Sequence, residues 1–205
     1  MSFADYAAFT IHDVKNRLAL LASRAETLGD RTMLRDALDA AGQLTSLLAC
    51  YKAEQGWLGV EVDAGQPDDL VGDLVAEFGQ LAGVPVRLEG TVGDGLFFFD
   101  ASLVRLVLNQ ALHNALRHAQ QEIVVRVAAE PQWLVFSVQD DGPGYPLELL
   151  SSSGNGAPLP LHDDGTGLGI YLAHRVAALH QNNGLAGSVE LRNAPGACFT
   201  LRLPR

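Results

Sequence analysis

The stretch TIHDVKNRLALL, residues 10–21, contains three side chains that could do chemistry together: His12, Asp13 and Asn16. An exposed imidazole is a nucleophile near neutral pH. Asp13 could hold one ring nitrogen of His12 as N–H, which would leave the other nitrogen free to attack an electrophile. A histidine here could equally be an ordinary surface residue. The rest of the chain must therefore supply something for it to react with.

Residues 3–29 are expected to form a helix, because apolar residues recur at alternating spacings of four and three. These residues are Ala7, Ile11, Val14, Leu18, Leu21, Ala25 and Leu28. After the turn GDRT (29–32), a helix over 32–56 repeats the pattern at Leu34, Ala37, Ala41, Leu44, Leu48 and Tyr51. Two such helices predict an antiparallel hairpin. His12, Asp13 and Asn16 then occupy the outward b, c and f heptad positions.

A single hairpin of this kind leaves apolar surface uncovered. Packing against a second copy would cover that surface in a four-helix bundle, so the sequence predicts a homodimer formed through residues 1–57. Packing of the hairpin on the remainder of its own chain is the alternative.

A polar stripe marks the helix expected over 101–119, for which Asp100 is the expected N-cap. The stripe lies on one face because its members fall at i, i+4, i+7 and i+8: Gln110, Asn114, Arg117 and His118. The buried side would be supplied by Leu103, Leu106, Val107, Ala111 and Ala115. Amide, guanidinium and imidazole groups in a row suit a metal-phosphate group lying along the helix. Taken alone, the stripe is also typical of a solvated helix face.

The motif DDGPG (140–144) directly follows an expected strand. The carboxylate of Asp140 at the strand end can accept a hydrogen bond from the exocyclic amine of adenine. Gly142 and Gly144 let the backbone turn and approach a flat ligand closely. A tight turn without a ligand is the simpler interpretation of this motif alone.

The motif GTGLG (165–169) opens an expected helix over 167–181. Its members are Gly165, Thr166, Gly167, Leu168 and Gly169. The glycines free the backbone, and amide groups at a helix N-terminus attract phosphate oxygens. The motif is not a dinucleotide-binding fingerprint, because the spacing is G-x-G-x-G, a loop precedes it and no βαβ unit follows. It also lacks the Lys-Ser/Thr of a P-loop.

The remaining elements predict an α+β fold. A helix is expected over 67–82, a short strand before it, and further strands over 84–90, 122–130, 133–141, 187–194 and 197–203. Because these strands come in hairpins, the sheet should be mixed or antiparallel rather than doubly wound. Residues 142–166 are rich in Gly, Ser and Pro and are expected to form one long loop, which is usually functional.

Composition excludes several classes of function. The net charge of −10 argues against non-specific nucleic-acid binding, which needs clustered Lys and Arg. The two cysteines lie far apart in the sequence and form no disulfide framework. No apolar run reaches the roughly 18–20 residues of a membrane span, and the N-terminus lacks a signal-peptide pattern. A cytoplasmic protein without a membrane span is expected.

The order of the three motifs resembles the Bergerat ATP-binding fold, which is shared by DNA gyrases, heat-shock chaperone ATPases, mismatch-repair ATPases and histidine kinases. The resemblance covers residue 58 to the C-terminus, where GACFTLRLP (196–204) is similar to the closing segment of histidine kinase catalytic domains. It implies a Bergerat-fold α/β sandwich with a mixed, largely antiparallel sheet.

By this resemblance, Asn114 corresponds to the asparagine that holds Mg²⁺, with Gln110 beside it as a second metal-facing residue. Arg117 corresponds to a basic residue that reaches a phosphate, and His118 to the aromatic position beside the nucleotide. Asp140 corresponds to the aspartate that reads adenine, with Gly142 and Gly144 in the same box. The phosphate box corresponds to Gly165, Thr166, Gly167, Leu168 and Gly169. Residues 145–164 correspond to the ATP lid.

Gln110 favours the kinase branch of this superfamily. Members that hydrolyse ATP carry a glutamate here to activate water, and an amide cannot act as a general base. Another nucleophile is then needed, and His12 can provide it. HDVKN (12–16) resembles the H-box of histidine kinase dimerisation domains, although the proline that usually follows the box is Arg17 here.

The resemblance therefore implies a dimerisation and phosphotransfer hairpin over 1–57 and an ATP-binding catalytic domain over 58–205. ATP and Mg²⁺ would phosphorylate His12, and the aspartate of a response-regulator receiver domain would then accept the phosphoryl group. Asn16 could position a water for the reverse, phosphatase reaction, and a separate sensor protein would supply the signal. The alternatives are a kinase-like histidine phosphotransfer protein that does not use ATP, and an anti-sigma-type serine kinase or switch module.

Overall fold

The computed structural model describes residues 3–152 and 167–205, with side chains from residue 9 onward except that of Ser152. The chain divides into two compact units, Met1–Leu58 and Gly59–Arg205, and each is described by itself. Among the described residues, no helix has both the length and the apolar character required to cross a bilayer.

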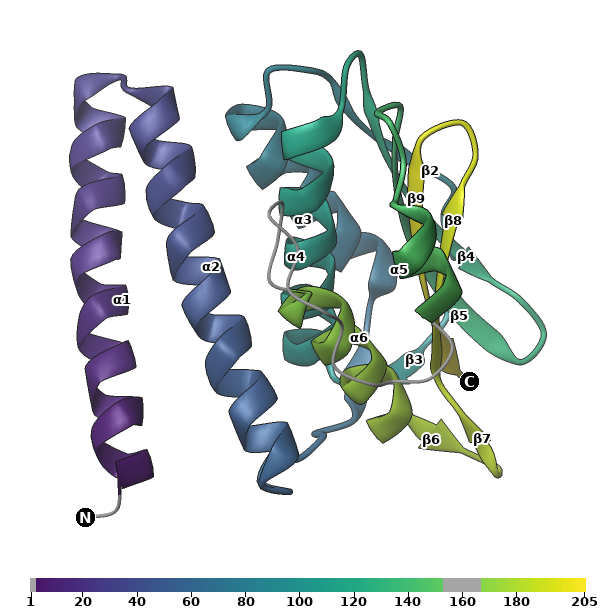
Figure 1. The fold of residues 1–205 in the computed structure, drawn as a ribbon. Coiled ribbons are helices and arrows are strands. Elements are labelled where there is room, and N and C mark those ends of the chain that lie inside the picture. Colours follow the sequence, from purple (N-terminus) through teal and green to yellow (C-terminus); the bar gives the residue numbers. More distant parts are fainter. Residues whose placement is uncertain (1–2, 153–166) are drawn as a thin grey trace. The chain divides into compact units, whose positions relative to one another are not determined.

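The first unit is an antiparallel pair of helices, α1 (Phe3–Leu28) and α2 (Arg31–Glu54) (Figure 1). The turn between them depends on Gly29, whose φ of +70° is a conformation that L side chains rarely adopt. Asp30 begins α2 as its N-cap, since its Oδ1 accepts the backbone N–H of Met33 at 3.0 Å. The predicted hairpin is confirmed.

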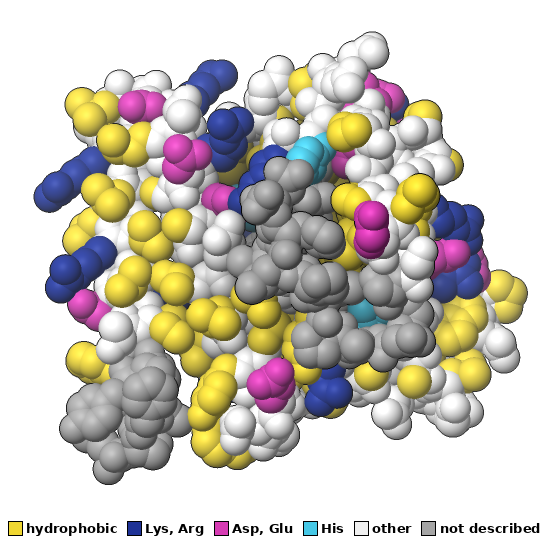
Figure 2. All heavy atoms as spheres, in the orientation of Figure 1, with side chains coloured by type: hydrophobic (Ala, Val, Ile, Leu, Met, Phe, Trp, Pro, Cys, Tyr) yellow, Lys and Arg dark blue, Asp and Glu magenta, His cyan; other side chains and the backbone are white. Residues whose placement is uncertain are grey.

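The buried residues of this hairpin have small side chains. They are Ala22, Ala25, Ala37, Ser46, Ala49, Cys50 and Ala53. Several larger apolar residues stay exposed instead: Phe9, Val14, Leu20, Leu21, Leu28, Met33 and Leu47. In the expected heptad pattern Ala25 is fully buried, whereas Leu28 is 78% exposed. Figure 2 shows hydrophobic side chains gathered along this hairpin, so a single copy leaves an apolar surface uncovered.

The second unit is built on a five-stranded sheet in the order β2-β4-β5-β9-β8. Its strands are β2 (Val86–Glu89), β4 (Ile123–Ala129), β5 (Trp133–Asp140), β8 (Ser188–Asn193) and β9 (Ala197–Pro204). β2 pairs with β4 in parallel, and every other pair in this sheet is antiparallel. The predicted α+β fold with a mixed, largely antiparallel sheet is confirmed.

Three helices cover one face of this sheet (Figure 1): α3 (Pro67–Leu81), α4 (Ala101–His118) and α6 (Leu168–Leu179). α4 packs against α3, α6 and β5, so its buried surface is wider than expected. The buried residues of α4 are Leu103, Val104, Val107, Leu108, Leu112 and Ala115. The expectation that Leu106 and Ala111 belong to this set is wrong, because both are only half-buried.

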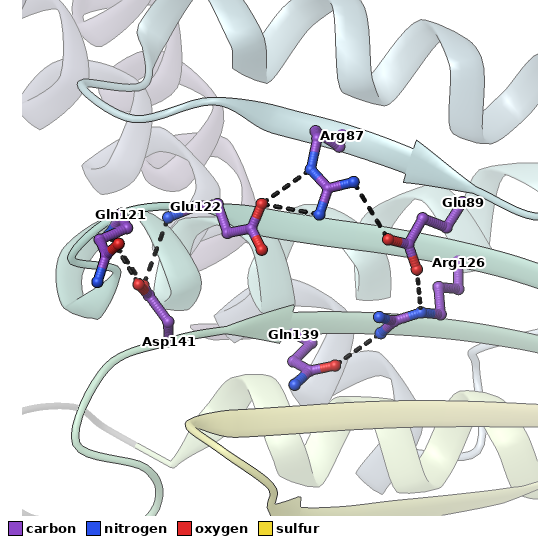
Figure 3. Close-up of polar contacts among 7 residues, drawn as sticks. All are labelled: Arg87, Glu89, Gln121, Glu122, Arg126, Gln139 and Asp141. Carbon is purple, nitrogen blue, oxygen red and sulfur yellow. Dashed lines mark hydrogen bonds and ion pairs between the residues drawn. The ribbon is translucent and has the colours of Figure 1, made fainter.

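The opposite face of the sheet carries a polar ladder across β2, β4 and β5 (Figure 3). Arg87 pairs with Glu122 at 2.8 Å and with Glu89 at 3.2 Å. Glu89 in turn accepts from Arg126 at 2.8 Å, and Arg126 donates to Gln139 at 2.6 Å. These polar pairs cover the face of the sheet that is exposed to solvent. The hydrophobic core lies on the other face, under the helices.

Several short elements differ from the sequence-based expectation. Residues 142–166 do not form one continuous loop, since α5 (Leu147–Ser152) lies within them. The helix expected to reach residue 181 ends at Leu179, where a small hairpin of β6 (Gln181–Asn182) and β7 (Leu185–Ala186) follows. A two-stranded sheet joins β1 (Asp63–Gly65) to β3 (Phe97–Phe99), and β3 was not expected.

Candidate functional site

Asp140 ends β5 in a buried position and is 4% exposed. Its Oδ1 accepts the backbone N–H of Gly142 at 2.8 Å and that of Ala197 at 3.3 Å. Its other oxygen, Oδ2, has no hydrogen-bond partner among the described residues. The carboxylate is therefore fixed through one oxygen and has the other available to accept a donor from a ligand.

Two glycines let backbone segments meet around this carboxylate. A Cβ on Gly142 would lie 2.4 Å from the carbonyl oxygen of His118. A Cβ on Gly196, in the turn before β9, would lie 2.3 Å from the carbonyl oxygen of Asp140. Neither position has space for a side chain. Close packing thus brings the end of α4, the DDGPG turn and the start of β9 into contact.

Gly144 and Tyr145 are held by Asn193 at the end of β8. The Tyr145 N–H donates to Asn193 Oδ1 at 2.8 Å, and Asn193 Nδ2 donates to the Tyr145 carbonyl at 2.9 Å. Gly144 has a φ of +84° and lies directly against the Asn193 side chain. Burial raises the pKa of the Tyr145 phenol, and the negative charge of Asp140 adds to the increase. Sequence reasoning missed both Asn193 and Tyr145.

Asp141 anchors the segment that follows α4. Its carboxylate accepts the backbone N–H of Gln120 at 2.8 Å. It also accepts those of Gln121 at 2.9 Å and Glu122 at 3.5 Å (Figure 3). These hydrogen bonds, led by that from Gln121, lower the pKa of Asp141. The two aspartates of DDGPG therefore have different roles. Asp141 binds the backbone of the segment after α4, whereas Asp140 has a carboxylate oxygen available to a ligand.

The predicted polar stripe lies on α4, whose N-cap is Asp100 as expected, with Leu103 N–H donating to its Oδ1 at 2.9 Å. Gln110, Asn114 and His118 are half-buried, and Arg117 is exposed. A Cβ on Gly169 would lie 3.3 Å from the Gln110 Cβ and 3.5 Å from its Oε1. The structure therefore brings Gln110 and the start of α6 together.

The GTGLG motif is described only from Gly167 onward, and Gly165 and Thr166 lie outside the described residues. Gly167 is the N-cap of α6 with a φ of +65°, and its carbonyl accepts the Tyr171 N–H at 3.1 Å. Leu168 and Gly169 form the first turn of the helix. Of the expected lid, residues 153–164 also lie outside the described part of the chain.

The described donor set fits a nucleotide with a bound divalent cation. Asp140 offers a carboxylate acceptor for an adenine amine, and the first turn of α6 offers backbone amides for phosphate. No cluster of three or more His, Cys, Asp or Glu side chains suited to a metal occurs among the described residues. Amide oxygens from Asn114 and Gln110 are hard ligands of the kind Mg²⁺ accepts when phosphate oxygens and water complete its shell.

His12 lies exposed on α1, with its Nδ1 3.3 Å from Asn16 Nδ2. Asp13 instead forms an ion pair with Arg17, at 3.1 Å between its Oδ2 and Arg17 Nη2. The partner expected for the imidazole was Asp13, and the structure places Asn16 beside the ring. One helical turn separates residues i and i+4, so both contacts follow from helix geometry.

Comparison with known proteins identifies the family of this chain. The family described as histidine kinase-, DNA gyrase B-, and HSP90-like ATPase matches residues 99–205, more than half of the chain. Signal transduction histidine-protein kinase AfsQ2 of Streptomyces coelicolor is 32% identical over 184 residues, covering 86% of this chain and 28% of that protein. Sensor histidine kinase MtrB of Mycobacterium leprae is 28% identical over 172 residues, covering 78% of this chain and 30% of that protein.

The chain thus spans less than a third of the length of these curated relatives. Among solved structures, full-length ShkA in complex with AMPPNP has a TM-score of 0.64 at 17% identity, covering 99% of this chain and 46% of that chain. This likeness supports the fold. The chain therefore belongs to the histidine kinase-, DNA gyrase B- and HSP90-like ATPase family, in which it has the build of a two-component histidine kinase core with a Bergerat ATP-binding domain.

Proposed function

We propose that this chain is an ATP-dependent histidine kinase that phosphorylates His12 and passes the phosphoryl group to a response-regulator aspartate. The observation that carries the nucleotide part is the buried Asp140 carboxylate, with one oxygen fixed by two backbone N–H groups and the other without a described partner. The oxygen left open in this way can accept a hydrogen bond from the adenine amine.

The nucleotide would lie between the DDGPG turn, α4 and the start of α6. Asp140 would read adenine, while Gly142 and Gly144 let the backbone approach the base. The amides at Gly167–Gly169 and the Arg117 guanidinium would contact phosphate, and Gly165 and Thr166 complete that assignment. Asn114 and Gln110 are the residues that would hold Mg²⁺, which when bound neutralises phosphate charge.

Phosphoryl transfer then needs a nucleophile other than water. Gln110 cannot remove a proton from water, because an amide has no basic lone pair at neutral pH. In our proposal His12 Nε2 attacks the γ-phosphorus, a P–N bond forms, and the P–O bond to ADP breaks. The ring is neutral before this step, with its proton on Nδ1. Attack through the Nε2 lone pair makes the ring a cation, which becomes neutral when Nδ1 releases its proton to solvent.

Asn16 is placed to control which nitrogen carries that proton. Its amide can donate to a bare Nδ1, or, rotated by 180°, accept from Nδ1–H. The second arrangement leaves the Nε2 lone pair available for attack. Asp13, paired with Arg17 on the same face, would lie beside the incoming phosphate, and Asn16 could later orient a water for dephosphorylation.

The exposed apolar side chains of α1 and α2 support a homodimer through the hairpin, completed as a four-helix bundle. The receiver domain of a response regulator is the proposed acceptor, and a separate sensor or signalling protein is the proposed source of the stimulus. The kinase would act in the cytoplasm, where ATP and Mg²⁺ are available.

The decisive experiment incubates the full chain with γ-labelled ATP and Mg²⁺. We expect acid-labile, base-stable label that is lost in His12→Gln. Phospholysine shares this lability. Lys15→Gln, three residues further along the same helix, is therefore the matched control and should keep the label. Label that persists in His12→Gln would contradict the assignment. An unlabelled wild type that also fails to bind nucleotide would favour a phosphotransfer protein that does not use ATP.

A further inference from the structure

We propose that His180 is a positioning residue that holds α4 and α6 in register at the end of the helix pair opposite the nucleotide site. The inference rests on the proposed nucleotide binding for its functional meaning and on the geometry of two buried side chains, His180 and Asp100. The two are 3% and 6% exposed, respectively. Neither residue belongs to the motifs that carry the proposed chemistry.

His180 links two backbone groups that are far apart in the sequence. Its Nδ1 lies 2.8 Å from the Val176 carbonyl, and its Nε2 lies 3.0 Å from the Asp100 backbone nitrogen. Because a carbonyl only accepts and an N–H only donates, Nδ1 carries the proton and Nε2 accepts. The imidazole is therefore neutral and fully hydrogen-bonded, and its orientation is fixed.

Asp100 extends the link to a third segment. Its Oδ1 caps α4 through the Leu103 N–H at 2.9 Å, and its Oδ2 accepts the Glu61 N–H at 2.9 Å. The backbone N–H that completes this set is the one bound by His180. Four hydrogen bonds therefore converge on two side chains where α4 begins and α6 has just ended.

The helix pair makes a second specific contact at its other end. Gln110 on α4 lies against Gly169 on α6, ten residues along α4 from Asp100 and eleven residues back along the chain from His180. Ten residues of helix rise about 15 Å. The helices are thus antiparallel, with Asp100–His180 at one end and Gln110–Gly169, beside the proposed phosphate site, at the other.

The hydrogen bond between His180 and Asp100 fixes the position of α6 along α4, which apolar packing alone does not fix. The buried residues of α6 between the two ends are all apolar: Leu172, Ala173, Val176 and Ala177. Hydrophobic contacts are non-directional, so they resist separation of the helices more than sliding. The hydrogen bond to Asp100 has a required distance and angle. Losing it should let α6 slide and displace Gly169 from Gln110.

Two substitutions separate the two hydrogen bonds of His180. His180→Gln places an amide oxygen where Nε2 lies and keeps an acceptor for the Asp100 N–H. His180→Asn places an amide nitrogen where Nδ1 lies and keeps only the donor to Val176. Both variants remove the ring and therefore lose its packing contacts. They differ in the hydrogen bond to the Asp100 N–H, which only His180→Gln keeps.

The first measurement is Mg²⁺-ATP affinity of the folded full chain, with thermal unfolding of each variant recorded alongside. We expect His180→Asn to bind at least about fivefold more weakly than His180→Gln, which stays within about twofold of the wild type. Equal affinities for two folded variants would overturn the proposal, even if His180→Asn unfolds at a lower temperature.

The second measurement does not depend on nucleotide binding. In a Cys50→Ala, Cys198→Ser background, Gln110→Cys and Gly169→Cys place two thiols at Cβ positions about as close as a disulfide requires. Oxidation should cross-link them at least threefold faster with His180→Gln than with His180→Asn. Equal rates would overturn the proposal. If the double-cysteine protein with His180 intact cross-links while the wild type binds no nucleotide, the proposed function is contradicted, and the cross-linking rates still test the register.

Discussion

The amide of Asn16 lies beside the imidazole of His12, with 3.3 Å between Asn16 Nδ2 and His12 Nδ1, while the neighbouring Asp13 is engaged by Arg17. The residue one turn away, rather than the adjacent carboxylate, is therefore the hydrogen-bonding partner of the proposed phosphorylation site. This relationship leads to the first prediction.

Asn16→Ala should slow phosphorylation of His12 by about 2- to 10-fold, the effect of losing one hydrogen bond that orients the ring. Initial rates of labelling from γ-labelled ATP measure this. Arg17→Ala is the control, because it breaks only the exposed Asp13–Arg17 ion pair, which is worth less than about 1 kcal/mol. An Asn16→Ala rate no lower than that of Arg17→Ala would exclude the orienting role.

Asp140→Asn should weaken ATP binding by about 10- to 150-fold and leave the fold intact. The remaining oxygen can still accept the N–H groups of Gly142 and Ala197, but an NH₂ group replaces Oδ2 and opposes the adenine amine. Isothermal titration calorimetry measures the affinity, and circular dichroism checks the fold. GTP provides the contrast, since guanine presents a carbonyl at this position and should lose less. A folded variant with unchanged ATP affinity would refute the adenine assignment.

Gln110→Glu should create the missing general base and raise hydrolysis of ATP by water, by about tenfold or more. Phosphate release measured in a His12→Gln background isolates this reaction from transfer to the hairpin. His12→Gln alone should release little phosphate. If the two proteins release phosphate equally, the identity of residue 110 does not select between water and histidine.

Leu21→Glu should weaken the proposed dimer, because an unpaired carboxylate would be buried where apolar residues are expected to meet. Sedimentation equilibrium should show a dimer dissociation constant raised at least about tenfold. Ala19→Glu introduces the same charge at an exposed position off the heptad seam and should leave the constant within a few-fold. A wild type that is monomeric at all concentrations would contradict the four-helix bundle.

Asp141 should make the second unit sensitive to acid. Backbone N–H groups led by that of Gln121 hold the pKa of Asp141 below its ordinary value of 3.8. Its contribution is then fully present above pH 3.8 and is lost as the pH falls through the lower, folded-state pKa. Urea denaturation at pH 3 to 7 should show a difference between wild type and Asp141→Asn that is largest at neutral pH and shrinks in acid.

The control for this measurement is Asp94→Asn, since Asp94 is exposed and has no hydrogen-bond partner among the described residues. This variant should follow the wild type at every pH. A difference between wild type and Asp141→Asn that stays constant from pH 7 to pH 3 would show that the carboxylate charge is not what stabilises the turn.

Local features were predictable because their physical causes are local. The heptad spacing gave the hairpin, Asp100 was recognisable as an N-cap, and alternation gave the strands on either side of Pro131. The hairpin β6–β7 was not predicted, although a local signal for it exists. Its turn, Asn183-Gly184, has positive φ at both residues, a conformation that Asn and Gly favour, but the apolar pattern of the preceding helix obscured it. The motifs likewise indicated where Asp140 and Gly142 would lie.

Contacts between distant residues were decided only by the tertiary structure. Asn193 holds Tyr145 across 48 residues, and His180 binds the Asp100 N–H across 80 residues. Neither pair leaves a periodic signal, because each depends on where two separate elements come to rest against the same core. The sequence by itself therefore determined the elements and the chemical groups they carry. Packing of the sheet and helices decided which groups meet, and so which oxygen of Asp140 remains available.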